Sequence, residues 1–353
     1  ASLGHVGYEE LRDQVAEQAR GLLRGGVDVL LIETQFDLLG IKASMNGCRA
    51  AMAELGIEVP IQVQVTIELT GRMLPGTEIG AALVALDPMR PDVIGINCAT
   101  GPEEMSEHVR HLSQHSRIPV SVLPNAGLPS VVDGEMHYDL TAEKFVEHQV
   151  RFVKDFGVSI VGGCCGTTPE YIRQLAEALD GVERPVRTPQ FEHGLASIYS
   201  PVALDRDESD ASSLIMIGER TNANGSKKFR EAMLEADWDT CVAMAKDQVK
   251  EGSHVIDVCV DYVGRDGTLD MVEIAQRFAT QSSVPLVLDS TEPEVVEAGL
   301  RWIGGRAMLN SANLEDGDGE GSRGDRVFRL AREYGAAVIC LLIDEEGQAR
   351  DVD

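Results

Sequence analysis

The sequence predicts an α/β fold in which short apolar strands alternate with amphipathic helices. Residues 27–33 (VDVLLIE) and 60–67 (PIQVQVTI) are apolar runs with little polar alternation, which is typical of strands buried on both faces of a parallel sheet. The segments between such runs repeat their apolar residues at helical spacing. Repeated strand–helix units of this kind build either a (β/α)8 barrel or a doubly wound sheet.

The elements of the first half follow in a regular order. A helix is expected over 8–24, because its apolar residues repeat at helical spacing and the glycines at 25–26 end it. The next helix carries an apolar stripe from Ile41 to Leu55. The last helix begins after Thr168 as the cap, with Pro169 at its first position. Strands are expected at 27–33, 60–67, 92–97, 118–123 and 158–163.

Residues 184–212 break this pattern and predict an interdomain linker, because they are rich in Pro, Ser and charge and lack a sustained period. The domains expected on either side are 1–183 and 213–353. Each half has about five strands, whereas a closed barrel needs about eight strands in about 250 residues. If each half is a barrel, the first half lacks the N-terminal part of its barrel and the second half lacks the C-terminal part. The later strands are expected at 213–218, 254–260, 284–289, 306–310 and 336–343.

Composition limits the function classes. The formal net charge is −27, and a surface this acidic repels phosphate backbones, so we expect no nucleic-acid partner. The chain has no apolar run of about 18 residues and its first residues do not resemble a signal peptide, so we expect no membrane span and a cytoplasmic location. Seven cysteines in a long chain disfavour a disulfide framework and raise the question of metal binding or catalysis.

Polar side chains follow nearly every expected strand. The carboxyl ends of parallel strands line the mouth of a barrel, so these side chains are candidates for an active site. Loops are polar in general, but that does not account for two adjacent cysteines. The residues are Glu33, Thr34, Thr66, Glu68, Cys98, Asn125, Cys164 and Cys165 in the first half, and Glu219, Asn222, Asp257, Asp261, Asp289, Asn310 and Asp344 in the second.

The stretch Gly162–Gly166 (GGCCG) is the most informative. Vicinal cysteines at a strand end point in divergent directions, and the flanking glycines allow a tight backbone path. Together with Cys98, which ends an earlier strand, they could hold a tetrahedral zinc ion that keeps its fourth position open for a substrate thiol. Spacing alone leaves open a catalytic zinc site or buried free cysteines. The other cysteines are expected in the core: Cys48, Cys241, Cys259 and Cys340.

Four motifs of the first half resemble a known family. They are LLIET (30–34), GINC (95–98), PNAGLP (124–129) and GGCCGTTPEYI (162–172). Over about residues 8–183 they resemble the zinc-dependent homocysteine-binding domain shared by cobalamin-dependent methionine synthases and related S-methyltransferases. The resemblance implies catalytic zinc ligands at Cys98, Cys164 and Cys165. It implies that Glu33 receives the homocysteine amino group and that the pocket also includes Thr66, Asn97 and Asn125.

The second half resembles the pterin-binding domain of cobalamin-dependent methionine synthases over residues 213–353. The motifs are GERTN (218–222), VIDVCVD (255–261), LDS (288–290) and LNS (309–311). Carboxylates can accept hydrogen bonds from the amino and ring N–H groups of a pterin. The resemblance assigns Glu219, Asp289 and Asn310 to the pterin, with Asn222, Asp257 and Asp261 as further candidates. For Asp257 a hydrogen bond to a neighbouring loop is the structural alternative.

Together the two resemblances imply two (β/α)8 TIM-type barrels, each incomplete in this chain. The implied reaction passes a methyl group from 5-methyltetrahydrofolate via cobalamin to the zinc-activated homocysteine thiolate, forming methionine and tetrahydrofolate. Cobalamin would be bound by a domain that this chain lacks, so we expect no turnover by the chain alone. Two alternatives stay open: a cobalamin-independent homocysteine S-methyltransferase, against which GERTN and LDS argue, and a non-catalytic zinc- or pterin-binding fragment.

Overall fold

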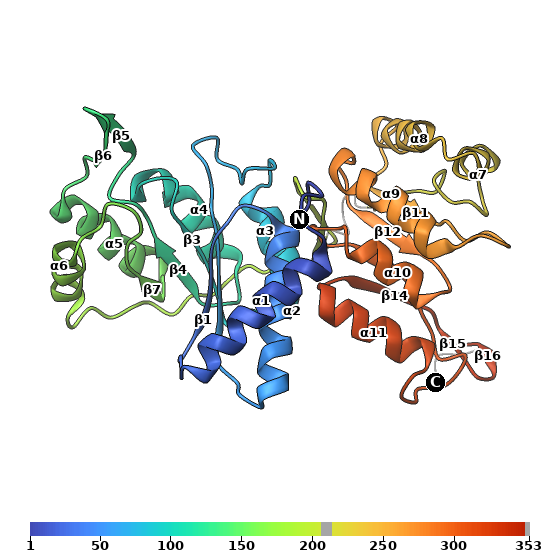
Figure 1. The fold of residues 1–353 in the computed structure, drawn as a ribbon, viewed down its shortest axis with the longest axis horizontal. Helices are drawn as coiled ribbons and strands as arrows, with labels where there is room; N and C mark the ends of the chain where they lie inside the picture. The colour runs from blue at the N-terminus through green and yellow to red at the C-terminus, as the bar shows by residue number, and fades with distance from the viewer. Residues whose placement is uncertain (206–213, 350–353) are drawn as a thin grey trace. The chain divides into compact units, whose positions relative to one another are not determined.

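The computed structural model describes residues 1–205 and 214–349 of the chain (Figure 1). The chain forms two compact units. The first unit comprises residues 10–83 and 90–192. The second unit comprises residues 1–9 and 84–89 together with the chain from His193 onward. Each unit contains its own five-stranded parallel sheet.

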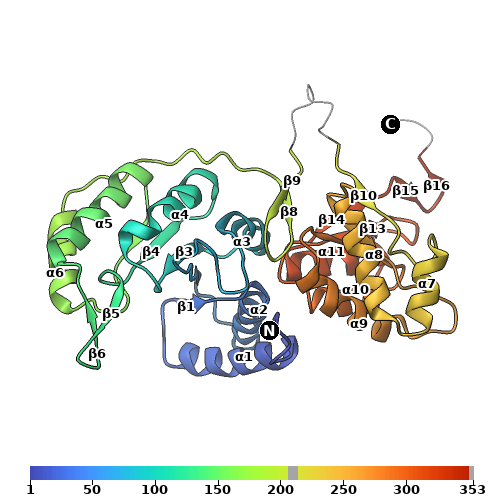
Figure 2. The same ribbon diagram turned by 90° about the horizontal axis from the view of Figure 1, so that it is seen from above.

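The sheet of the first unit has its strands in sequential order, each parallel to the next. They are β1 (Leu30–Gln35), β2 (Ile61–Val65), β3 (Val93–Asn97), β4 (Val120–Leu123) and β7 (Ile160–Val161). A hairpin of β5 (Pro129–Val132) and β6 (Glu135–Tyr138) follows β4 and projects from the sheet (Figure 2). The helices in this part of the chain are α1 (Tyr8–Arg24), α2 (Leu38–Leu55), α3 (Ile79–Leu86), α4 (Pro102–His115), α5 (Ala142–Phe156) and α6 (Pro169–Leu179), with the short 3-10 helix η1 (Asp87–Met89) after α3.

The helix ends follow from the local sequence. The Asp37 carboxylate caps α2 by accepting a hydrogen bond from the N–H of Leu39, and Gly56 ends the helix in the left-handed conformation at φ 64°. An N-cap of this kind stabilises a helix by about 1 kcal/mol. Helix α6 starts at Pro169 as predicted, although Thr168 at the cap position makes no side-chain hydrogen bond to the helix.

The sheet of the second unit repeats the sequential parallel order. Its strands are β10 (Ile217–Gly218), β11 (Val255–Val258), β12 (Leu286–Asp289), β13 (Met308–Ala312) and β14 (Ala337–Cys340). Two antiparallel hairpins accompany it: β8 (Gly194–Ala196) with β9 (Pro201–Ala203), and β15 (Ile343–Asp344) with β16 (Gly347–Gln348). The helices are α7 (Lys227–Leu234), α8 (Trp238–Lys250), α9 (Gly267–Gln281), α10 (Pro293–Leu300) and α11 (Arg323–Tyr334).

One face of the second sheet changes from apolar to polar along its strands. Val255 and Val287 pack against Leu195 of the β8–β9 hairpin near the amino ends of the strands. Side chains alternate along a strand, so Asp257 and Asp289, two residues further on, project to the same face at the carboxyl ends. The hairpin therefore closes the apolar end of this face and leaves the carboxylates at the other end.

The segment expected as a linker, residues 184–212, contributes to the core of the second unit. Residues 194–203 form the β8–β9 hairpin, and Ala196 bridges to Arg306 just before β13. Leu195 is fully buried. The apolar stretch is only a few residues long, so it gives no period that the sequence alone could reveal. Residues 206–212 of the expected linker, and the first residue of the strand expected at 213–218, lie outside the described residues.

The α/β class with parallel sheets is confirmed, and each half supplies a sheet of five parallel strands as predicted. The observed strands differ from the expected ranges by a few residues at their ends, because runs of apolar residues extend past the hydrogen-bonded ladder. Each sheet is open, with β1 and β7 at the edges of one and β10 and β14 at the edges of the other. Among the helices in the described parts of the chain, none combines the length and the apolar character needed to cross a bilayer.

Replacing Leu195 with alanine should destabilise the second unit. The side chain is fully buried against Val255 and Val287, so the cavity left behind should cost about 2–5 kcal/mol of unfolding free energy. Urea denaturation followed by circular dichroism measures this. Val186→Ala in the same expected linker is the matched control, because Val186 is 91% exposed. Equal stability of the two variants would contradict the packing of Leu195 against Val255 and Val287.

Candidate metal and pterin sites

Three cysteines meet at the carboxyl ends of the first sheet. Cys98 follows β3, and Cys164 and Cys165 follow β7. The Sγ atom of Cys165 lies 3.7 Å from that of Cys98 and 3.9 Å from that of Cys164, and all three lie within 4.8 Å of one another. A tetrahedral zinc ion with Zn–S bonds of about 2.3 Å requires sulfur atoms about 3.8 Å apart. The three thiols, none of them in a disulfide, therefore fit the ion that the sequence suggested.

The end of β4 holds both cysteine segments. The N–H of Cys98 donates to the carbonyl of Leu123 at 3.2 Å, and the N–H of Cys164 donates to the carbonyl of Pro124 at 2.8 Å. β4 lies between β3 and β7 in the sheet. Two adjacent carbonyl groups at the end of β4 thus fix two segments, at Cys98 and Cys164, that are 66 residues apart in the sequence.

The backbone at Cys98 is strained. Cys98 and Ala99 have φ angles of 62° and 61°, in the left-handed region that residues with a side chain rarely adopt. Such a conformation costs on the order of 1 kcal/mol per residue and persists where surrounding contacts enforce it. Here the N–H of Thr100 donates to the carbonyl of Cys98 at 2.8 Å, and the N–H of Asn125 donates to the carbonyl of Thr100 at 3.0 Å.

The glycines around the vicinal cysteines are required by close approach. A Cβ atom on Gly163 would lie 2.4 Å from the Thr167 side chain. In this position the Thr167 hydroxyl donates a hydrogen bond to the carbonyl of Cys164 at 2.6 Å. Gly166 has φ 80°, and a Cβ atom there would lie 2.4 Å from the ring of Tyr138. Thr167 and Tyr138 were not among the residues assigned to the site from the sequence.

Asn97 and Asn125, both buried, were assigned to the homocysteine pocket by resemblance, and their contacts are with the cysteine segments. The Asn97 side-chain N–H group donates to the Thr34 hydroxyl at 2.8 Å and to Cys164 Sγ at 3.8 Å, while its carbonyl accepts from the N–H of Thr34 at 2.9 Å. The Asn125 side-chain carbonyl accepts from the N–H of Cys165 at 3.1 Å. Both asparagines thus lie beside the thiols.

Glu33 and Thr66 lie at the carboxyl ends of β1 and β2. Glu33 is exposed and precedes Thr34, the residue that bonds to Asn97. It lines a groove of about 300 Å³ that also includes Leu31. Thr66 is fully buried, and its hydroxyl has no hydrogen-bond partner among the described residues. The roles of both residues toward homocysteine remain predictions.

Burial disfavours ionised thiols when no cation is present. It raises the pKa of Cys164 to about 12, with further raising contributions from Cys98 and Cys165. Burial also raises the pKa of Cys98. Three thiolates this close repel one another, and a divalent cation supplies the compensating charge. Of the remaining cysteines, three are buried as expected; Cys340 is exposed, so the prediction that it belongs to the core is wrong.

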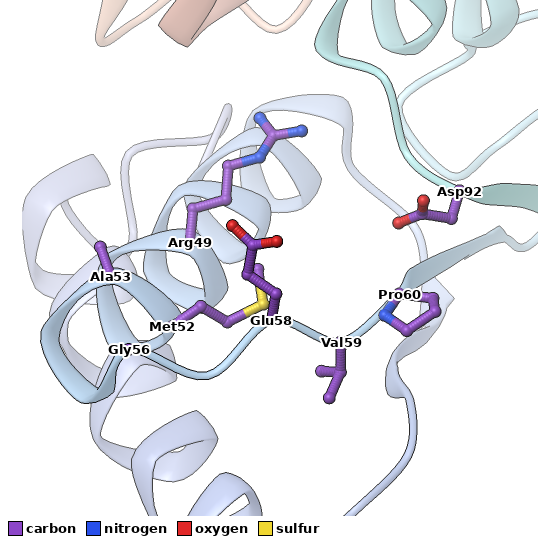
Figure 3. A pocket seen from close by; sticks show the side chains of 8 residues that line it. All are labelled: Arg49, Met52, Ala53, Gly56, Glu58, Val59, Pro60 and Asp92. Carbon is purple, nitrogen blue, oxygen red and sulfur yellow. The ribbon is translucent and has the colours of Figure 1, made fainter.

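A groove of about 950 Å³ lies at the opposite end of the first sheet (Figure 3). Pro60 and Asp92 line it just before β2 and β3, and Arg49 and Glu58 lie in the same groove. The Asp92 carboxylate accepts a hydrogen bond from the N–H of Ile61 at 2.8 Å, so it caps the start of a strand. In barrel-type sheets this end contributes to stability, whereas the chemistry lies at the carboxyl ends.

The residues assigned to the pterin come together at the carboxyl ends of the second sheet. The side-chain N–H group of Asn222 donates to Asp257 at 2.9 Å and to Asp289 at 3.1 Å. Asp289 and Asn310 are register partners on β12 and β13. Glu219 is exposed, and its charge acts on both Asp257 and Asp289. One amide thus bridges two carboxylates, with a third carboxylate nearby.

Asp257 is buried, and burial raises its pKa to about 6. The charges of Asp289 and Glu219 raise it as well, while the hydrogen bond from Asn222 lowers it. Burial also raises the pKa of Asp289, followed by the charge of Asp261. The charge of Arg323 lowers the pKa of Asp289, but burial outweighs it. The cluster therefore holds desolvated acceptors, which suits a ligand with several N–H donors.

Asp261 has a different set of contacts. Its carboxylate accepts hydrogen bonds from the Ser290 hydroxyl at 2.8 Å and 3.0 Å and from the N–H of Thr291 at 3.1 Å. These bonds order the loop between β12 and α10. A hydrogen bond to a neighbouring loop, the structural alternative for Asp257, is thus found for Asp261, whereas Asp257 bonds to the site residue Asn222.

Comparison with known families agrees with both sites. Residues 1–179 match the family profile of homocysteine S-methyltransferase. The chain belongs to the homocysteine S-methyltransferase family. Its second half adds a match to the pterin-binding enzyme profile over residues 218–353.

The relatives of this family member include two mycobacterial proteins. The chain is 52% identical over 349 residues to the methionine synthase of Mycobacterium tuberculosis, covering 99% of this chain and 29% of that protein. It is 51% identical over 357 residues to the methionine synthase of Mycobacterium leprae, covering 100% of this chain and 29% of that protein. The chain therefore spans less than a third of the length of these curated relatives. A solved structure of Rhizobium etli pyruvate carboxylase, 12% identical, covers 96% of this chain and 30% of its own, and its TM-score of 0.21 is too low to carry an argument.

Asp257→Asn should stabilise the chain at neutral pH. The folded-state pKa of about 6 exceeds the ordinary value of 3.8, so stability is lost as the pH rises through 6 and the buried carboxyl ionises. The neutral amide avoids this cost, which we expect to be about 1–3 kcal/mol at pH 7. The difference should vanish below about pH 4, where both side chains are neutral. Denaturation curves at pH 4 and pH 7 measure it, and an unchanged or lower stability at pH 7 would contradict the buried charge.

Proposed function

We propose that this chain carries the homocysteine-activating and folate-binding parts of a methionine synthase. The overall reaction would transfer the methyl group of 5-methyltetrahydrofolate, via cobalamin, to homocysteine, giving methionine and tetrahydrofolate. The convergence of Cys98, Cys164 and Cys165 carries the proposal, because three thiols at zinc-compatible distances are the donor set that activates a substrate thiol. The carboxylate–amide cluster of the second unit supports the folate half.

The first unit would bind and orient homocysteine. When bound by the three cysteines, zinc would supply Lewis acidity that lowers the pKa of the substrate thiol and holds its thiolate. Asn97 and Asn125 keep the Cys164–Cys165 segment in place through their hydrogen bonds. The exposed carboxylate of Glu33 would accept the substrate amino group. The orphaned hydroxyl of Thr66 is a further candidate for a polar contact with the substrate.

The second unit would hold the pterin through its N–H groups. Asp257 and Asp289 are oriented by Asn222 and are ionised above their raised pKa values, so they can accept from the amino and ring N–H groups. Asn310 and Glu219 lie beside them as additional polar partners. Positioning the methyl donor in this way lowers the entropic part of the transfer barrier.

We further propose the division into a homocysteine domain (1–183), a linker (184–212) whose β8–β9 hairpin packs on the second unit, and a pterin domain (213–353). The profile matches at 1–179 and 218–353 support these bounds. Cobalamin would be bound by a domain elsewhere in the protein, which agrees with the greater length of the relatives. A cytoplasmic location, expected from the sequence, is part of the same proposal.

Cys164→Ser should abolish zinc binding. The chain purified with zinc and dialysed should contain about one zinc ion, and loss of one of three thiolate ligands should reduce this to near zero. Metal analysis by mass spectrometry measures the content. Cys340→Ser is the control, because Cys340 is exposed and outside the cluster. Full zinc retention by the Cys164 variant would rule out the proposed metal centre.

Asp289→Asn should weaken binding of 5-methyltetrahydrofolate by about 10- to 100-fold, because a hydrogen bond to a charged acceptor contributes about 1.5–3 kcal/mol. Affinity of the unmodified chain should also fall below about pH 6, where Asp257 becomes protonated and can no longer accept. Isothermal titration calorimetry measures both effects. Asp239→Asn, an exposed aspartate of α8, is the matched control. Absence of folate binding by the unmodified chain would instead favour a cobalamin-independent methyltransferase.

A further inference from the structure

We infer that Gln64 is a specificity-determining residue for the substrate: its side-chain carbonyl accepts a hydrogen bond from the homocysteine ammonium group, beside Glu33. The inference rests on the proposed function, since it concerns the substrate of the metal centre. Gln64 lies on β2 and was not among the residues assigned to the pocket from the sequence. This contact makes the pocket select thiols that carry an amino group where homocysteine does.

The Gln64 side chain is fully buried, and its carbonyl oxygen has no hydrogen-bond partner among the described residues. The hydroxyl of Thr66, two residues further along the chain, is buried and unpaired in the same way. Residues two apart on an extended strand project to the same face of the sheet. Buried polar atoms in folded proteins are nearly always paired with protein, water or a ligand. Two such atoms on one face therefore indicate a bound group with hydrogen-bond donors.

Ser121 holds the other side of the Gln64 amide. The side-chain N–H group of Gln64 donates to the Ser121 hydroxyl at 2.8 Å, reaching across β3 to β4. Gly95 of β3 is the register partner of both residues, and a Cβ atom there would lie 2.1 Å from the Ser121 side-chain oxygen. A glycine in a strand leaves room for such a close approach. The amide is thereby held with its N–H side toward β4, and its carbonyl oxygen is available to another donor.

Gln64 also lies beside the residue expected to receive the substrate amino group. Leu31 of β1 is the register partner of Gln62 of β2, and Glu33 and Gln64 lie two residues further along their strands. The exposure of β1 alternates as far as Glu33, so Glu33 stays on the face of Leu31. Neighbouring strands are about 4.8 Å apart. A group bound by the Glu33 carboxylate is therefore within reach of the Gln64 carbonyl.

The same face of the sheet leads to the thiols. Asn97 lies two residues beyond Gly95 on β3, so both project to one face, and Gly95 is the register partner of Gln64. The side-chain N–H group of Asn97 donates to Cys164 Sγ at 3.8 Å. The unpaired carbonyl of Gln64 and the cysteine cluster thus lie on one side of the sheet, where a single small ligand can contact both.

An ammonium group has three N–H donors and no acceptor, so it binds best where three acceptors converge. Glu33 supplies the negative charge, and the Gln64 carbonyl and the Thr66 hydroxyl supply the two further acceptors. A thiol without an amino group leaves the buried carbonyl of Gln64 unpaired. A site rejects ligands that lack a donor by this kind of penalty. The pocket thus distinguishes homocysteine from simple thiols.

The experiment compares Gln64→Met with the unmodified full chain, both loaded with zinc. Methionine keeps the length of the side chain and removes the amide. Isothermal titration calorimetry measures the affinities for homocysteine and for 4-mercaptobutyrate, which has the same thiol and carboxylate but no amino group. We expect the preference for homocysteine to fall by about 10- to 100-fold, because a hydrogen bond to a charged group is lost. Zinc content and the affinity for 4-mercaptobutyrate should stay unchanged. An unchanged preference would overturn the inference, as would an equal loss for both thiols.

Gln62→Met is the matched control, because Gln62 also donates to the Ser121 hydroxyl, at 3.2 Å, from two residues nearer the amino end of β2. It should leave the preference unchanged, and a loss as large as that of Gln64→Met would overturn the inference. Gln64→Glu keeps an acceptor oxygen and adds a charge, so it should raise the preference for homocysteine. An unchanged or lower preference would also overturn the inference, even if Gln64→Met failed to fold. Failure of the unmodified chain to bind either thiol would instead refute the proposed function.

Discussion

The parallel direction of the strands is the constraint on which both sites depend. It brings the carboxyl ends of all five strands of a sheet to one edge, so residues distant in the chain meet there. In the first unit the end of β4 adds the decisive contacts, because its last carbonyl groups accept from the N–H groups of Cys98 and Cys164. The three thiols are thus placed by main-chain hydrogen bonds before any metal ion contributes.

Placement of the thiols has a local conformational cost. Cys98 and Ala99 adopt left-handed backbone angles, and Gly163 and Gly166 are needed where other side chains approach too closely. Buried side-chain contacts offset this cost, above all the bonds from Asn97 and Asn125 to the cysteine segments. In the proposed metal centre, such a rigid arrangement would limit rearrangement when a substrate thiol enters.

In the second unit, the buried carboxylates likewise lower stability in a place where they are available to bind a ligand. Asp257, which is buried, and Asp289, which is half-buried, both accept hydrogen bonds from one amide. Burial penalises their ionised forms, so the cluster weakens the fold at neutral pH while it offers acceptors to a donor-rich ligand. The apolar packing of Leu195, Val255 and Val287 at the other end of this face supplies compensating hydrophobic stabilisation.

The sequence by itself determined the alternation of strands and helices, because apolar runs and helical periods reflect burial directly. It also identified Cys98, Cys164 and Cys165, since vicinal cysteines between glycines have few structural explanations. It did not reveal the β8–β9 hairpin within the expected linker, because a buried stretch of a few residues leaves no period. Nor did it distinguish Asp261, which orders a loop, from Asp257, which faces Asn222. Only the tertiary structure decided these points, because hydrogen-bond partners such as Asn97 and Leu123 are set by distances between segments that no local pattern encodes.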